Sequence, residues 1–238
     1  MKIKNTFVLL ATFVALLTAC KKSGNNTGDT PAKKLKYLSQ MTTVQGTSTI
    51  ITTYTYDDKN RVSTVQNGTS TSTYSYNGNN LFSVEDLTPS TGFRQVTEYA
   101  YNNDGSISST HARIYRNNAL SNDITYTYLV VNGRITERHY DLYVDKYTYD
   151  NKGNVISFYS QQSGLTTVNT YDDKLNKYTN GFLNPNGFSF TPNNLASSTS
   201  AIAYTYTYTY DADGYPTGAV IEGPPGNTVK YTYTYTER

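Results

Sequence analysis

The sequence predicts an all-β fold: one antiparallel meander of hairpin repeats that forms a long, twisted or curled sheet, as a trough or partial barrel. The first observation is a repeated phrase, Tyr-x-Tyr followed by a short Asp/Asn/Gly turn and an apolar residue. A unit that recurs with a period of roughly twenty to thirty residues is typical of stacked repeats rather than of one globular core. The clearest copies span 54–62, 74–82, 99–107 and 147–155, and looser copies span 126–135, 169–176, 208–216 and 231–236.

The second observation is the local pattern inside each copy. Alternation of Tyr with Thr or Ser has the period of a β-strand, which places rings on one face and hydroxyls on the other. Asp or Asn then opens a turn, and Gly or Asn near its end tolerates a positive φ. Each copy is therefore a hairpin, and the whole set predicts roughly 14 strands. Open sheets rarely exceed about 10 strands without curling, so we expect curvature.

The third observation is the abundance of tyrosine. Tyr accounts for 25 of 238 residues, within an apolar share of only 37%, so Tyr must be the main packing residue. A second interpretation is a glycan-binding platform, because sugars stack on aromatic faces. Rings packed against one another favour a structural role, whereas rings facing an open groove favour sugar. The candidate binding residues are Tyr204, Tyr206, Tyr208, Tyr231 and Tyr233.

A register follows at the C-terminal end if 211–214 and 223–227 are simple loops. Tyr206 then lies opposite Ala219, and Ala219 opposite Tyr231, so that two rings lean over a small residue. A slip of one residue would place rings on both faces, so we expect this register to be tightly held. The last strand is expected to be an exposed edge, restrained from aggregation by its flanking charges.

The phrase resembles the YD repeat of the RHS family, which reads roughly Y-x-Y-D-x-x-G-R-L. The positions of its last three residues are occupied here by 60–62, 133–135 and 153–155, and the resemblance covers about residues 50–236. Residues 171–176 and 208–217 are similar to small YD-repeat-like lipoproteins of Bacteroidota, which include the DUF4595-type families. The resemblance implies a strand-hairpin build. It does not imply the RHS shell around a toxin, because this chain has too few repeats.

The N-terminus has the pattern of a lipoprotein signal peptide over residues 1–19. Lys2 and Lys4 precede an apolar run at 7–17, which is too short to span a membrane, and Leu-Thr-Ala-Cys at 17–20 matches a lipobox. We expect cleavage before Cys20 and acylation of its thiol, which anchors the chain in the membrane. Lys21 after the acylated residue favours the outer membrane, with the leaflet left open. An ordinary secretory signal with an incidental cysteine is the alternative.

The rest of the chain divides simply. Residues 20–34 form the lipidated cysteine and a flexible tether, and 35–238 form one repeat domain. An irregular loop insertion is expected at 180–200, where prolines argue against a central strand. It contains Phe182, Phe188 and Phe190, which we expect to pack the loop against the sheet, with partner binding as the alternative.

Catalytic and cofactor chemistry is not indicated. His111 and His139 lie in different repeats without metal-site spacing, and Asp211–Gly214 lacks the first Asp and last Glu of a calcium loop. No nucleophile elbow, phosphate-binding loop or zinc motif is present. Loss of Lys2 and Lys4 with the signal lowers the 20 basic residues to 18, against 18 acidic ones. A neutral chain gives no support for nucleic-acid binding.

Two function classes remain. The first, preferred here, is a non-catalytic, lipid-anchored scaffold or interaction module of the cell envelope that meets other proteins through its edges or faces. The second is a glycan-binding lipoprotein beside a polysaccharide uptake system. A third, an immunity or adaptor protein related to RHS systems, rests on analogy alone. No metal or cofactor is expected, and the membrane is contacted through the N-terminal lipid.

Overall fold

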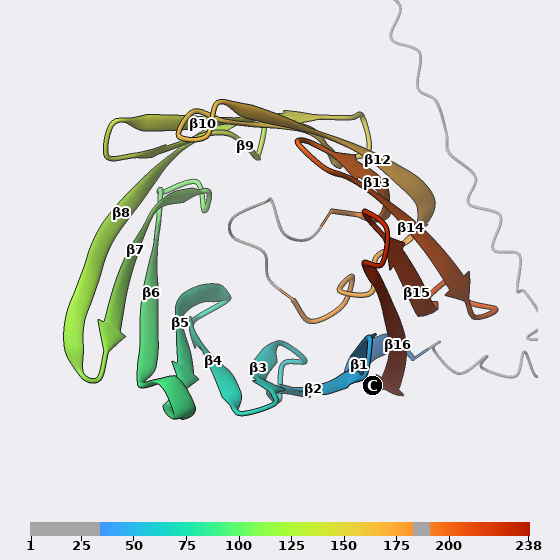
Figure 1. Cartoon of the computed structure of the whole chain (residues 1–238). Helices are drawn as coiled ribbons and strands as arrows, with labels where there is room; N and C mark the ends of the chain where they lie inside the picture. Colours follow the sequence, from blue (N-terminus) through green and yellow to red (C-terminus); the bar gives the residue numbers. More distant parts are fainter. Residues whose placement is uncertain (1–33, 183–190) are drawn as a thin grey trace, which may run out of the picture. The chain divides into compact units, whose positions relative to one another are not determined.

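The computed structural model describes residues 34–182 and 191–238, which belong to one compact unit, Lys34–Arg238. Within it, each strand pairs antiparallel with the next in sequence (Figure 1). The strands are β1 Lys36–Gln45, β2 Ser48–Tyr56, β3 Val62–Asn67, β4 Ser70–Asn77, β5 Asn80–Thr88, β6 Phe93–Tyr101, β7 Ile107–Arg116, β8 Ala119–Val131, β9 Arg134–Tyr140, β10 Tyr143–Tyr149, β11 Val155–Ser160, β12 Leu165–Leu175, β13 Asn193–Thr199, β14 Ala203–Tyr210, β15 Pro216–Glu222 and β16 Thr228–Glu237.

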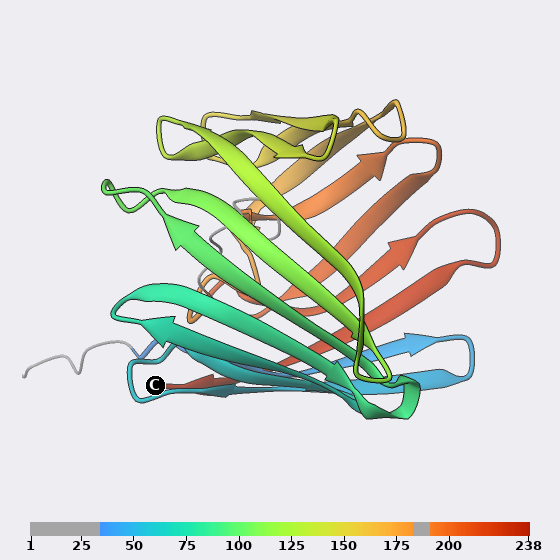
Figure 2. The same ribbon diagram turned by 90° about the vertical axis from the view of Figure 1, so that its left-hand side faces the viewer.

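The predicted all-β meander is confirmed, but the sheet is a closed barrel rather than a trough. β16 pairs with β1 from Lys36↔Glu237 to Gln45↔Val229, so neither end of the meander is a free edge. The expectation of an exposed last strand is therefore wrong, because closure gives both terminal strands partners. Figure 2 shows the strands inclined to the barrel axis, as closure requires. The only helical segment among the described residues is a short 3-10 turn at Pro89–Thr91.

Rings and hydroxyls separate onto two faces as predicted. In β14 the tyrosines are half-buried and the intervening threonines are exposed. The tyrosines point into the barrel, where Leu38, Tyr54, Ala219 and Tyr233 form one buried cluster. A second buried cluster lies on β7 and β9–β11 and contains Ile107, Ile135, Tyr147 and Val155. The barrel wall is thus packed on its inner face, and Thr and Ser face outward in the Tyr-x-Tyr strands.

A recurring hydrogen bond links successive repeats. The hydroxyl group of the last Tyr in a phrase donates a hydrogen bond to a backbone carbonyl. The acceptor residue lies at or near the start of the strand that leaves the preceding turn. Tyr149, for example, donates to the carbonyl of Ile135 at 2.7 Å, and Tyr76 to that of Val62 at 2.6 Å. The same bond joins Tyr56 to Leu38, Tyr101 to Leu81, Tyr171 to Val155 and Tyr235 to Pro216. Each bond contributes about 0.5–1.5 kcal/mol and fixes neighbouring repeats in register.

A register shift of the β-bulge type accompanies the last Tyr of the Tyr-x-Tyr position in six of the phrases, and it overturns part of the predicted register. The pairing shifts between Thr209 and Tyr210, so that Tyr208 lies opposite Ala219, and Tyr206 opposite Ile221. The predicted pairing of Tyr206 with Ala219 is wrong by two residues, because the turn at 211–215 has five residues rather than four and the bulge adds one more. The pairing of Ala219 with Tyr231 is confirmed. The corresponding shifts in the other phrases lie at 55/56, 75/76, 100/101, 148/149 and 170/171.

The insertion after β12 is shorter than predicted. Residues 193–199 form β13, which pairs with both β12 and β14, so the C-terminal part of the expected 180–200 loop is a central strand. The strand begins directly after Pro192, where proline is tolerated. The described part of the insertion runs inside the ring of strands (Figure 1). Phe182 packs against Tyr54 and Tyr178, with ring centroids 5.7 and 4.8 Å away, as expected of it. Phe188 and Phe190 lie outside the described residues.

Candidate functional site

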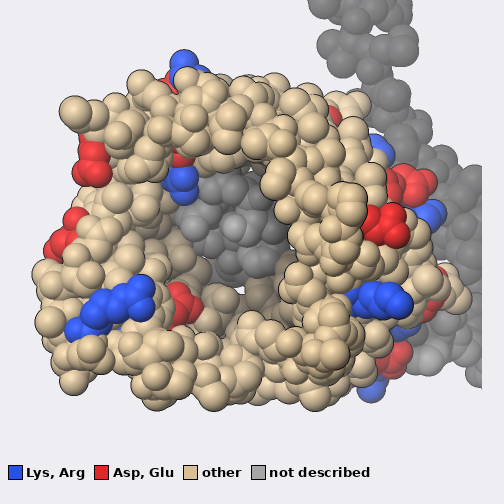
Figure 3. All heavy atoms as spheres, in the orientation of Figure 1, with Lys and Arg blue, Asp and Glu red and all other residues tan. Residues whose placement is uncertain are grey.

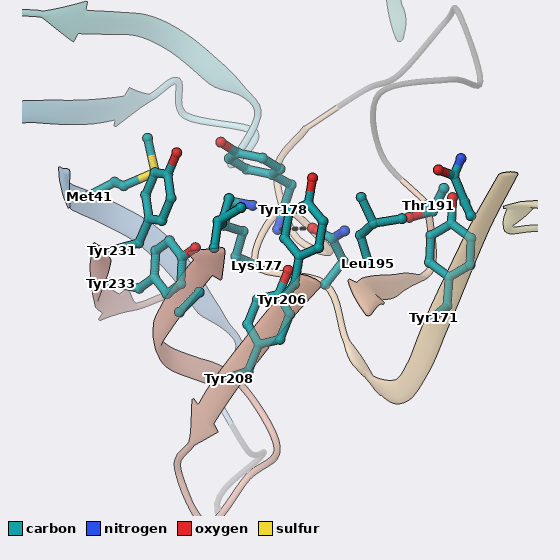
Figure 4. A pocket seen from close by; sticks show the side chains of 14 residues that line it. Met41, Tyr171, Lys177, Tyr178, Thr191, Leu195, Tyr206, Tyr208, Tyr231 and Tyr233 are labelled. Carbon is teal, nitrogen blue, oxygen red and sulfur yellow. Dashed lines mark hydrogen bonds between the residues drawn. The ribbon is translucent and has the colours of Figure 1, made fainter. Parts of the chain in front are cut away.

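The predicted tyrosine platform lines a cavity inside the barrel. Four of its five members, Tyr206, Tyr208, Tyr231 and Tyr233, border a cavity of about 390 Å³. Tyr204 does not; its ring lies against Gly223, where a Cβ atom would approach it to 2.5 Å. Figure 4 shows the rings of β14 and β16 directed toward the described segment that follows β12. The remaining lining residues are Met41, Asn169, Tyr171, Asn176, Lys177, Tyr178, Thr191, Leu195, Ala219 and Ile221.

The hydroxyls of these four rings differ from those of the linking tyrosines. Among the described residues, none of the four makes a hydrogen bond through its hydroxyl, and none of these oxygens is a buried atom without a partner. The hydroxyls therefore reach the open space of the cavity. Tyr231 and Tyr233 present nearly parallel rings, with centroids 6.2 Å apart and planes 11° from parallel. The cavity wall thus combines flat aromatic faces with accessible hydroxyl groups.

Lys177 supplies the positive charge of this cavity. Its Nζ lies 4.5 Å from the ring centroid of Tyr178 and 5.5 Å from that of Tyr233. No described acidic side chain pairs with it. Burial lowers the pKa of Lys177 to about 8, because its ammonium group is partly removed from water. Ring faces stabilise a cation weakly, by about 0.5–2 kcal/mol each, so the ammonium retains capacity to bind an anion.

A second cavity adjoins the first. It measures about 440 Å³ and shares Asn169, Tyr171 and Leu195 with the Lys177 cavity. Its far wall contains Arg138, whose guanidinium forms an ion pair with the fully buried Asp145 at 2.5 Å. The interior thus offers a connected polar and aromatic space rather than a completely filled core.

Sequence reasoning found the rings but not the charged groups. Lys177 follows a loose copy of the phrase, and no spacing rule distinguishes it from an exposed turn lysine. It reaches the cavity only because the segment after β12 folds into the barrel. Arg138 and Asp145 face each other across β9 and β10, a pairing that depends on the register of two strands. The charged residues along these two strands did not indicate that Arg138 and Asp145 would form a buried pair.

The other residues considered from the sequence lie apart from the cavity. His111 contacts Asp123 at 2.5 Å on the outer face, and His139 contacts Glu137 at 2.9 Å. Asp211 accepts hydrogen bonds from backbone amides of its own turn and pairs with Lys36 at 2.7 Å. Its carboxylate is thus engaged in turn formation. Cys20 lies outside the described residues.

The described residues form neither a candidate metal site nor a candidate membrane-spanning helix. Residues 34–182 and 191–238 contain no cluster of three or more His, Cys, Asp or Glu side chains arranged for a metal ion. Over the same ranges, no helix has the length and apolar character needed to cross a membrane. Figure 3 shows acidic and basic side chains interspersed around the wall, so this view has no surface of one sign.

Comparison with known proteins finds a solved structure with a similar fold. A porin-like protein from Bacteroides uniformis superposes with a TM-score of 0.55 at 14% identity, covering 83% of this chain and 96% of that one. A porin-like protein from Bacteroides vulgatus gives 0.45 at 10% identity, with 85% and 99% covered. The TcdB2-TccC3-Cdc42 complex gives 0.32 at 18% identity, with 77% of this chain and 10% of that chain covered. No family model matches the chain, and no curated protein matches it.

Proposed function

We propose that this protein is a non-catalytic, lipid-anchored binding protein of the cell envelope that holds a glycan inside its barrel. The observation that carries the proposal is the cavity of about 390 Å³ bordered by Tyr206, Tyr208, Tyr231 and Tyr233. Its size is within the range of small-molecule sites, which combine apolar or aromatic walls with a few polar groups. The first interpretation of the sequence was a scaffold that meets partners through its edges or faces, and its edge-mediated form loses support because the two terminal strands pair and close the described barrel.

The envelope assignment has three supports. The lipobox ending at Cys20 predicts a lipid anchor, and the YD-like phrases resemble those of Bacteroidota lipoproteins. The likeness to a porin-like Bacteroides protein agrees with an envelope setting. A transmembrane barrel carries an apolar outer band. Here exposed threonines occupy the outward positions of β14 and alternate positions of β16, which favours attachment through lipid.

Glycan binding is tested on the chain from residue 21 onward, which retains every strand of the barrel. Isothermal titration with a panel of neutral and acidic oligosaccharides should show binding that Tyr206→Ala weakens by about tenfold, the effect of losing about 1.4 kcal/mol. Thr207→Ala is the matched control, because its side chain is exposed on the outer face of the same strand. Equal affinities for the two variants, or no binding by the folded parent, would remove the lumen as the binding site.

A protein-binding scaffold is the second candidate function. The outer face of β9–β11 has a shallow depression of about 350 Å³ lined by Glu137, Val144, Lys146, Tyr159 and Gln161. Apolar and charged groups together suit a protein surface. Capture of a defined envelope protein that depends on Tyr159 but not on Tyr206, with no sugar bound, would favour this candidate over the first.

The lipid anchor gives a prediction of its own. Cys20→Ser should abolish acylation and leave a precursor that retains residues 1–19, because the lipoprotein signal peptidase requires the lipid-modified cysteine. Mass spectrometry of the intact protein and fractionation of the envelope measure both effects. Lys21→Ser is the matched control and should still be acylated. Normal processing and membrane retention of the Cys20 variant would contradict the lipoprotein assignment.

A further inference from the structure

The cavity bordered by Lys177 is positively charged and rich in hydroxyl groups. Among the described residues, its lining contains no Asp or Glu, and Lys177 is the only charged member. Four phenolic hydroxyls reach its open space, beside the amides of Asn169 and Asn176 and the hydroxyl of Thr191. Aliphatic lining is limited to Met41, Leu195, Ala219 and Ile221. The wall therefore complements a polyol that carries a negative charge better than it complements an acyl chain.

We propose that this cavity binds an acidic sugar, the uronic acid residue of an oligosaccharide, with the Lys177 ammonium paired to the sugar carboxylate. This inference rests on the proposed glycan-binding function and names its ligand class. The partly exposed ring of Tyr231, held parallel to the buried ring of Tyr233, offers a face for the apolar side of the pyranose, and the hydroxyls of Tyr206 and Tyr208 lie where they can hydrogen-bond its hydroxyls. A carboxylate held this way is bound by a charge-assisted hydrogen bond in a partly desolvated site.

The titratable groups around the cavity leave Lys177 as the group that responds near neutral pH. The others are tyrosines, and burial raises the pKa of each above its usual value of about 10, so all stay neutral below pH 9. They are Tyr171 of β12, Tyr178 of the following segment, Tyr206 and Tyr208 of β14, and Tyr231 and Tyr233 of β16. Lys177 is cationic below its pKa of about 8 and loses its charge above it. Affinity for an acidic sugar should therefore fall as the pH rises from 7 to 9.

The test compares galacturonate oligosaccharides with neutral galactose oligosaccharides of equal length, by isothermal titration at pH 7. The parent chain should bind the acidic series about tenfold or more tightly, the preference expected of one charge-assisted contact. Lys177→Met keeps the aliphatic stem and should abolish that preference. Lys174→Met is the matched control, because Lys174 is a half-exposed lysine near the end of β12 that pairs with the exposed Asp173. It should retain the preference.

The outcomes separate this inference from the proposed function. If acidic and neutral oligosaccharides bind the parent equally and Lys177→Met changes neither, the glycan function stands and the acidic-sugar assignment is wrong. If neither series binds the folded parent, both the glycan-binding function and the acidic-sugar assignment are wrong. Tighter binding of a fatty acid such as laurate than of any sugar, dependent on Lys177, would also overturn the assignment. Thermal melts of all variants show whether a lost preference reflects lost folding, and Lys177→Arg should restore the preference in a folded chain.

Discussion

Replacing Arg138 with methionine is expected to lower the free energy of unfolding by about 3–5 kcal/mol, because it leaves Asp145 buried without its ionic partner. Asp145 has no exposed surface, and its Oδ2 accepts hydrogen bonds from Nε and Nη2 of Arg138 at 3.1 and 2.5 Å. Its Oδ1 has no hydrogen-bond partner among the described residues, so the carboxylate depends heavily on this one guanidinium. The rings of Tyr126 and Tyr140, 5.1 and 5.4 Å from the guanidinium carbon, cannot replace that charge.

Urea denaturation of two further variants controls this prediction. The double variant Arg138→Met/Asp145→Val removes both charges and should recover most of the stability, since an apolar pair can replace a buried ion pair at little cost. Lys146→Met, on the neighbouring outward position, should cost at most about 1 kcal/mol, because its contact with Glu137 is 3.8 Å long and exposed. Equal losses in the Arg138 single and double variants would show that the buried charge is not the cause.

The sequence predicted those features that depend on local pattern. Alternation in Tyr-x-Tyr strings has a period of two, so the inward rings and outward threonines of β14 followed directly from neighbouring residues. Turn chemistry at positions such as 211–214 correctly located the hairpins. Strand alternation and turn formation depend only on residues within one repeat. A meander of hairpins could therefore be predicted from the repeats in a single sequence.

Closure and register depended on long-range contacts. β1 carries no copy of the phrase, yet it supplies the partner for β16 and converts an open sheet into a barrel. The bulge before Tyr210 and a turn of five residues instead of four depend on hydrogen bonding in the finished hairpin, and together they moved the pairing of Tyr206 by two residues. Lys177 enters the candidate site through the folding of one insertion onto distant strands. None of these long-range contacts can be predicted from the pattern of neighbouring residues alone.

Ala219→Lys is expected to destabilise the barrel by about 3 kcal/mol or more, whereas Val220→Lys should cost less than about 1 kcal/mol. Ala219 is 6% exposed and belongs to the buried cluster with Leu38, Tyr54 and Tyr233. It lies between Tyr208 on β14 and Tyr231 on β16, so that two large side chains flank one small one. A lysine there must displace packed rings and place its ammonium inside the barrel, and both effects oppose folding.

The control residue is adjacent in sequence and points to the other face. Val220 lies opposite Thr207 and Lys230 on the outer surface, so a lysine there meets water and one like charge. Thermal unfolding followed by circular dichroism should therefore separate the variants, at roughly 2–4 °C for each kcal/mol in a domain of this size. Equal shifts in the melting temperature would contradict packing on a single face. A larger shift for Val220→Lys would mean that β15 is turned over, which would also remove Ala219 and Ile221 from the wall of the Lys177 cavity.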